Sequence, residues 1–263
     1  MEKVEKQNLN YEGLSKKVIS SALKMPLVRV DRQQYLRQEL AKYYSAEVVE
    51  CAIETNPQSA GVSDEIIAKI AKTTINKEVN AASVVSAGLG LPGGWAMAGT
   101  IPVDLAQFYG VVINGMQKLM YLYGWSDLTL TEENMDDETY NTVLIMLGVM
   151  SGNAAAANLI KKSALAASSH VQKVIMKTAV SKTAWYPMLK EIGKWVGINI
   201  TKQTTAKGAA KFVPVLGAGM SFGATQLIMR GMFQKLKKQL EASNAVILES
   251  PNEQEIDIDT IVF

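Results

Sequence analysis

The sequence predicts an all-α protein, a compact multi-helix domain with glycine-rich apolar helical turns or hairpins. Apolar residues recur at helical spacing along most of the chain, and residues that cap helices stand before several of these segments. No convincing β-type alternation appears, except in the final IDIDTIVF, which we expect to be disordered or to form a docking strand. Apolar residues make up 48% of the chain and charged residues 20%, a composition typical of a globular protein with a sizeable core.

In the first half of the chain, capping residues and prolines separate the expected helices. Pro26 ends the first amphipathic segment, and Asp31 and Ser45 stand where an N-cap would begin the next two. The acids that follow Ser63 lie in a first helical turn, where the helix dipole favours negative charge. These features predict helices over residues 11–25, 32–44, 45–56 and from 63 to about 87.

In the second half, the expected helices are longer and more apolar. Pro102 suits the first position of a helix, because its missing N–H group would be unpaired there in any residue. Lysines become frequent after residue 160. The predicted helices cover residues 102–124, 136–160, a lysine-rich segment after 160, 185–196, a stretch after 202, and 217–242.

Charge is distributed unevenly, and this suggests a domain organisation. Residues 161–238 carry 14 basic residues and one acid, whereas residues 239–263 carry six acids and no basic residue. We divide the chain into an N-terminal extension, a helical domain and an acidic, flexible tail, over residues 1–25, 26–242 and 243–263. The single cysteine, Cys51, excludes an internal disulfide framework and fits a reducing cytoplasm, and the first residues predict no secretory leader.

Three stretches contain no charged residue: residues 80–103, 139–160 and 212–229. Each approaches the span of about 20 apolar residues that a membrane helix needs. Glycine pairs at GxxxG spacing recur within them, and such pairs let two helix backbones approach closely. The sequence leaves open whether these stretches pack inside the protein, form re-entrant turns near residues 88–102 and 214–224, or enter a bilayer.

Four blocks in a fixed order resemble the EcsC family of bacterial proteins, named for a member of an operon that encodes an ABC-type exporter. The blocks are VDRQQYLRQELAKYY (30–44), GLPGGWAMAGTIPVDLAQFYG (90–110), QKLMYLYGW (117–125) and AAKFVPVLGAGMSFGATQ (209–226). The resemblance extends from about residue 28 to residue 238. It implies an all-helical protein that is cytoplasmic or membrane-associated, and it supplies no catalytic residue to transfer to this chain.

A polar stripe follows one side of the helix expected after Pro102. Asp104, Gln107, Asn114 and Lys118 share one face at helical spacing. Asp104 lies in the first turn, where a carboxylate meets unpaired backbone N–H groups, so helix capping is one interpretation. The alternatives are a solvated face or a buried polar seam that binds a headgroup or a substrate.

Other candidate chemistries are excluded or weak. Cys51 and the single histidine, His170, cannot assemble a zinc site, and nothing supplies His170 with a catalytic triad, so we expect no catalytic residue, metal or cofactor. The acidic run 131–138 lacks the ligand spacing of a calcium loop. The GxGxxG pattern at 88–93 does not follow a β-strand, so it does not predict a nucleotide site.

The basic segment gives the most informative pattern. The helix expected over 185–196 places Trp185 and Trp195 on an apolar stripe, with Lys190 and Lys194 on another side. Tryptophans at headgroup depth beside lysines are typical of interfacial helices. We name six candidate lipid-binding residues: Trp185, Lys190, Lys194, Trp195, Lys173 and Lys177. The same pattern also fits a helix that packs in a soluble core while its lysines face water.

These observations favour a non-enzymatic protein at the cytoplasmic face of the membrane, which binds anionic lipid or a membrane complex such as an exporter. One alternative is a soluble protein that binds a protein partner or nucleic acid through residues 161–238. Nucleic acid is the weaker choice because Arg230 is the only arginine there, and phosphate recognition commonly uses arginine forks. The other alternative is an enzyme that uses the polar seam at Asp104.

Overall fold

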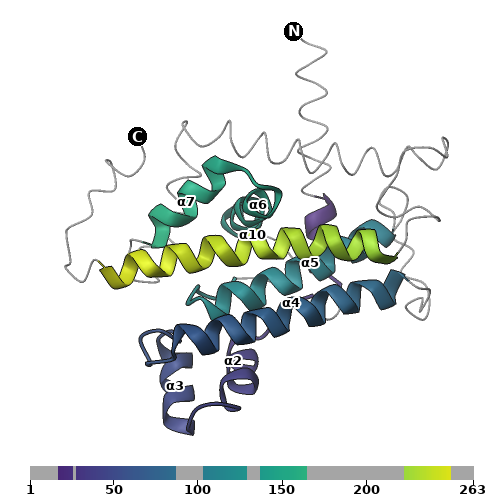
Figure 1. Ribbon diagram of the computed structural model, residues 1–263. Coiled ribbons are helices and arrows are strands. Elements are labelled where there is room, and N and C mark those ends of the chain that lie inside the picture. Colours follow the sequence, from purple (N-terminus) through teal and green to yellow (C-terminus); the bar gives the residue numbers. More distant parts are fainter. Residues whose placement is uncertain (1–16, 26–27, 87–102, 129–136, 165–221, 250–263) are drawn as a thin grey trace, which may run out of the picture.

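The fold was analysed in a computed structural model, which describes residues 17–25, 28–86, 103–128, 137–164 and 222–249. Every regular element in these ranges is a helix, and none of them contains a strand (Figure 1). The all-α fold class is therefore confirmed for the part of the chain that the structure describes. Residues 17–23 form the described part of the first predicted helix.

The two short helices α2 (Arg32–Leu40) and α3 (Ala46–Glu54) begin where the sequence places their caps. The Asp31 carboxylate accepts a hydrogen bond from the Gln34 amide at 2.8 Å, which satisfies an unpaired N–H group of the first turn. Ser45 occupies the N-cap position of α3 but makes no capping bond with its side chain. The helix predicted over 32–44 ends earlier, at Leu40, and residues 41–44 form a turn.

Three long helices, α4 (Asp64–Ser86), α5 (Val103–Leu122) and α10 (Phe222–Glu249), lie side by side (Figure 1). α5 ends where Gly124 adopts a φ of 82°, which lets the Trp125 amide donate back to the Met120 carbonyl at 2.9 Å. α10 continues through Glu249, past the predicted helix end at 242, so the first residues of the expected tail belong to this helix.

One long helix was predicted over 136–160, and this prediction was wrong. The structure has two helices there, α6 (Asp137–Ser151) and α7 (Ala154–Ala164). Gly152 adopts a φ of 97°, and its amide and that of Asn153 both donate to the Gly148 carbonyl, at 3.1 and 2.9 Å. The Asn153 side chain then caps α7 by accepting a bond from the Ala156 amide at 2.9 Å. The chain therefore turns sharply within an uncharged sequence.

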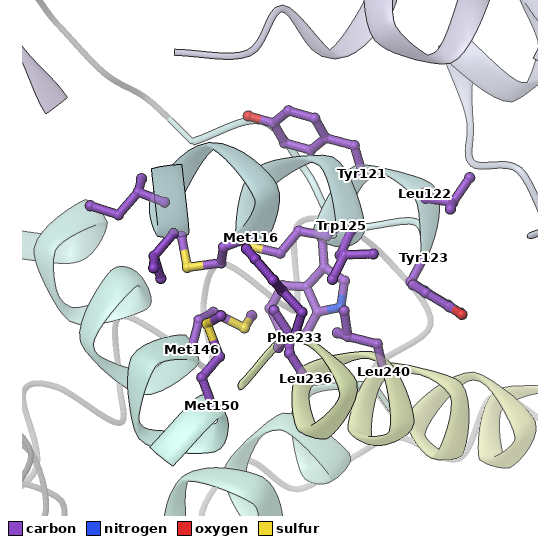
Figure 2. Packing of buried hydrophobic residues seen from close by; sticks show 14 of the residues in the cluster. Met116, Tyr121, Leu122, Tyr123, Trp125, Met146, Met150, Phe233, Leu236 and Leu240 are labelled. Carbon is purple, nitrogen blue, oxygen red and sulfur yellow. The ribbon is translucent and has the colours of Figure 1, made fainter. Parts of the chain in front are cut away.

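The main core lies where α10 packs against α4, α5, α6 and α7. The buried stripe of α10 repeats every three or four residues and meets α6 and the end of α5 (Figure 2). α6 is buried on every side from Thr139 to Met150, so this part of the uncharged stretch 139–160 is a core helix. The side chains in Figure 2 that fill this core include Met116, Trp125, Met146, Met150, Phe233, Leu236 and Leu240.

Candidate functional site

Half of the predicted polar seam of α5 can be placed, and it contacts other parts of the fold. The side chains of Asp104 and Gln107 lie outside the described residues, although both positions belong to α5. Lys118 donates from Nζ to Glu78 Oε1 of α4 at 2.6 Å, and these side chains are 25% and 11% exposed. Asn114 donates to the Val28 carbonyl at 3.4 Å. In this half, the seam ties α5 to α4 and to the segment before α2.

Gln117, the most buried polar residue of this region, was not predicted from the sequence. Its side-chain amide donates to the carbonyls of Val28 and Ile113, at 2.8 and 3.1 Å, and its oxygen accepts from the Val30 amide at 3.3 Å. These bonds satisfy a side chain with no exposed surface. Its position one turn after Asn114 was the signal that could have identified it. The role of Gln117 is to hold residues 28–30 against α5.

A second polar cluster lies where α2, α3 and the end of α5 meet. Arg32 donates to the carbonyls at the end of α3, to Ile53 at 2.7 Å and to Thr55 at 3.2 Å. These carbonyls have no partner inside their own helix, so the guanidinium completes the C-terminus of α3. Burial lowers the pKa of Arg32, while the nearby Asp127 carboxylate acts in the opposite direction.

Three buried atoms of this second cluster have no hydrogen-bond partner among the described residues: Arg32 Nε, Gln58 Nε2 and Ser126 Oγ. Tyr121 points away from the apolar core of Figure 2, toward the chain that follows α5. Burial, followed by the nearby Asp127 carboxylate, raises the pKa of Tyr121. Buried polar atoms of this kind are ordinarily satisfied by ordered water, and we expect water to bridge them.

The surface of α7 and α10 carries lysines without carboxylate partners. Lys161, Lys235 and Lys238 are exposed and form no ion pair within the described part of the chain. Lys235 donates to the neutral Ser151 carbonyl at 3.1 Å, so no described carboxylate offsets its charge. Lys237 is different because it pairs with Glu241. We call the exposed residues Lys161, Lys235 and Lys238 the basic α7–α10 surface.

The described basic residues near α2 and α3 differ, because Arg37 and Lys42 have carboxylate partners. Arg37 and Glu50 form two hydrogen bonds at 2.9 Å, and Glu39 pairs with both Lys42 and Lys77, at 2.5 and 3.3 Å. α2 and α7 lie on opposite sides of the three long helices (Figure 1). Carboxylates therefore offset Arg37 of α2 and Lys42 in the turn that follows it, whereas α7 and α10 expose three lysines that form no ion pair with any described residue.

Large apolar side chains are exposed at two places in the described residues. Leu227 is 73% exposed and its neighbour Ile228 is 40% exposed, both near the start of α10. The other is Tyr43, which is 40% exposed and has the Lys69 ammonium 5.0 Å from its ring centre. Two adjacent exposed aliphatic side chains at a helix start are the more unusual feature.

The predicted lipid-binding residues Lys173, Lys177, Trp185, Lys190, Lys194 and Trp195 all lie outside the described residues, as does His170. Cys51 is exposed on α3. Among the described residues, no group of three histidine, cysteine or acidic side chains could hold a metal ion.

None of the helices described is both long enough and apolar enough to cross a bilayer by itself. Thr139–Ser151 and Ala154–Lys161 satisfy the length and composition criteria only as a pair, with a bend of 119° between them. The core position of α6 accounts for its apolar composition without lipid.

No family model, curated protein or solved structure matches this chain. The resemblance to the EcsC family therefore stays a prediction from the four sequence blocks.

Proposed function

We propose that the protein is a non-enzymatic helical protein that attaches to anionic membrane surfaces on the cytoplasmic side. The observation that carries this proposal is the basic α7–α10 surface, whose lysines have no carboxylate partners among the described residues. Unpaired ammonium groups near an anionic leaflet each contribute about 1 kcal/mol to binding. A membrane complex, such as an exporter, would be reached from the same surface.

The sequence extends this basic character beyond the described lysines. Residues 161–238 carry 14 basic residues against one acid, and Lys161 and Lys238 mark the two ends of that segment. In support, α7, which carries Lys161, packs against α10, which carries Lys238. The predicted interfacial residues Trp185 and Trp195 lie in the chain between them. This arrangement supports a single basic membrane-facing side.

Charge removal on this side tests the proposal. Lys238→Gln removes one exposed, unpaired charge and should weaken partitioning onto anionic vesicles about fivefold. The double variant Lys161→Gln and Lys238→Gln should weaken it about 30-fold, because the two contributions add. Lys235 is left unchanged because it also bonds to the Ser151 carbonyl. Partitioning is measured by vesicle flotation over a range of lipid concentrations.

Lys42→Gln is the matched control. It removes the same charge from the turn that follows α2, where Glu39 already compensates it. We expect partitioning close to that of the unmodified protein. Equal losses from the control and from Lys238→Gln would show that binding follows net charge alone, and would contradict the proposed surface.

A further inference from the structure

Three helix ends meet at one end of the bundle. Gln226 and Arg230 of α10 bond to Asn80 and Asn76 of α4, at 3.5 and 2.6 Å, so α10 runs antiparallel to α4 and starts beside its last turns.

α5 is also antiparallel to α4. Lys118, in the second half of α5, pairs with Glu78, in the second half of α4. Tyr123, just after α5, lies near Asp64, the first residue of α4: burial raises the pKa of Tyr123, and the carboxylates of Glu241 and Asp64 raise it further. The end of α4 and the starts of α5 and α10 therefore point the same way (Figure 1).

This bundle end joins two distant parts of the sequence. The uncharged stretches 80–103 and 212–229 both reach it, one through the end of α4 and the start of α5, the other through the start of α10. Within the described residues, the exposed Leu227 and Ile228 belong to the second stretch. Among the described residues, the exposed Leu227 and Ile228 thus lie near the start of α10, at the bundle end that the two uncharged stretches share.

The exposed face of α10 changes character along its length. Leu227 and Ile228 lead to Gly231, whose Cα faces open space, and then to Lys235 and Lys238. On the opposite face, α10 buries the stripe Met229, Phe233, Leu236 and Leu240. An aliphatic end followed by lysines on one exposed face is the pattern of a helix that meets a membrane interface at an angle.

We propose that this bundle end inserts Leu227 and Ile228 into the boundary between headgroups and acyl chains of an anionic bilayer. This inference rests on the proposed membrane attachment and goes beyond it, because it names the contact and the orientation. Lys235 and Lys238, further along the same face, reach the headgroup phosphates, while α2 and α3 stay away from the lipid. Apolar insertion of this kind survives a high-salt wash that releases purely electrostatic attachment.

The test measures lipid contact at two sites. An environment-sensitive fluorophore is attached either to the native Cys51 of α3, which is exposed, or to position 228 in a Cys51→Ser, Ile228→Cys variant. Vesicles contain anionic lipid with brominated acyl chains, which quench fluorophores at the boundary. We expect strong quenching at position 228 and none at Cys51. A second variant, Leu227→Gln with Ile228→Gln, should lower vesicle partitioning about tenfold or more, whereas Tyr43→Gln should not.

Three other outcomes would contradict the insertion, and one of them would contradict the membrane attachment as well. Protein that floats with anionic vesicles while the fluorophore at position 228 stays unquenched would overturn the insertion but leave the proposed attachment intact. A fluorophore at 228 that is already shielded before vesicles are added would show that the chain itself covers this patch, and would also overturn it. Absence of flotation would overturn the proposed function together with this inference.

Discussion

Gly115 of α5 and Gly231 of α10 show that local packing decides whether a glycine-to-alanine substitution stabilises or destabilises the protein. A Cβ atom at Gly115 would lie 2.6 Å from Phe233 Cζ and 3.0 Å from Glu78 Cγ, whereas a Cβ at Gly231 would meet nothing within 4 Å. Gly115→Ala should therefore lower the free energy of unfolding by about 1–3 kcal/mol, because α10 must move away from α5. Gly231→Ala should raise it by about 0.5–1 kcal/mol through better helix propensity. Chemical denaturation of both variants checks this pair, and a similar effect at both sites would contradict the packing.

Glu39 gives stability a defined dependence on pH. Burial alone would raise the pKa of this carboxyl, but hydrogen bonds from Lys42 and Lys77 outweigh burial and lower the pKa below its ordinary value of 4.5. The folded state therefore gains stability that is complete above this pH and is lost as the pH falls through the lowered pKa. Glu39→Gln should be less stable than the unmodified protein at neutral pH, and the difference should shrink below pH 4.5. Denaturation curves across this range measure it, and a constant difference would contradict the assignment.

Single residues were predicted unevenly from the sequence. Asp31 was predicted to cap a helix because an acidic residue directly before a helical segment can accept bonds from the amides of its first turn. The structure confirms this prediction. Lys118 was placed on a polar stripe, but its partner Glu78 is 40 residues earlier in the chain and no local pattern links the two. Gln117 was missed for the same reason, since its bonds to Val28 and Val30 depend on tertiary contact.

At the scale of elements, Arg32 connects the start of one helix to the end of another. It is the first residue of α2, and its guanidinium bonds to the last carbonyls of α3. Arg32→Gln should lower the free energy of unfolding by about 2 kcal/mol, because these charge-assisted bonds are lost inside the protein. Arg32→Lys should recover part of this loss, since an ammonium retains the charge but not the fork.

Arg37→Gln is the control for this prediction. Arg37 lies on the same helix and pairs with Glu50, but both side chains are about half exposed. Exposed pairs contribute little, so stability should stay nearly unchanged. Denaturation of the three variants under one condition compares them, and equal stability of Arg32→Gln and Arg37→Gln would contradict the capping role.

Helix positions were easier to predict than helix ends. Capping residues and proline placed the starts of α2, α3 and α5 within a few residues. The break between α6 and α7 was missed because Gly152 and Asn153 lie within an uncharged run that continues the helical period. Only the left-handed conformation of Gly152 and the cap by Asn153 separate the two helices.

At the scale of the whole molecule, the structure shows on which helices the described basic residues lie, which counting charges along the sequence could not show. The sequence shows that basic residues concentrate after residue 160, but the sequence alone does not show where they lie. α10 packs between the early helices α4 and α5 and the later helices α6 and α7. This position packs α7, which carries Lys161, against α10 and places α7 on the opposite side of the long helices from α2 (Figure 1).

Vesicle flotation of the unmodified full chain tests the central claim most directly, with neutral and anionic vesicles compared before and after a high-salt wash. We predict flotation with anionic vesicles alone, through the basic α7–α10 surface, and retention of a fraction after the wash through Leu227 and Ile228. Absence of flotation with anionic vesicles, or equal flotation with neutral ones, would contradict attachment through unpaired lysines.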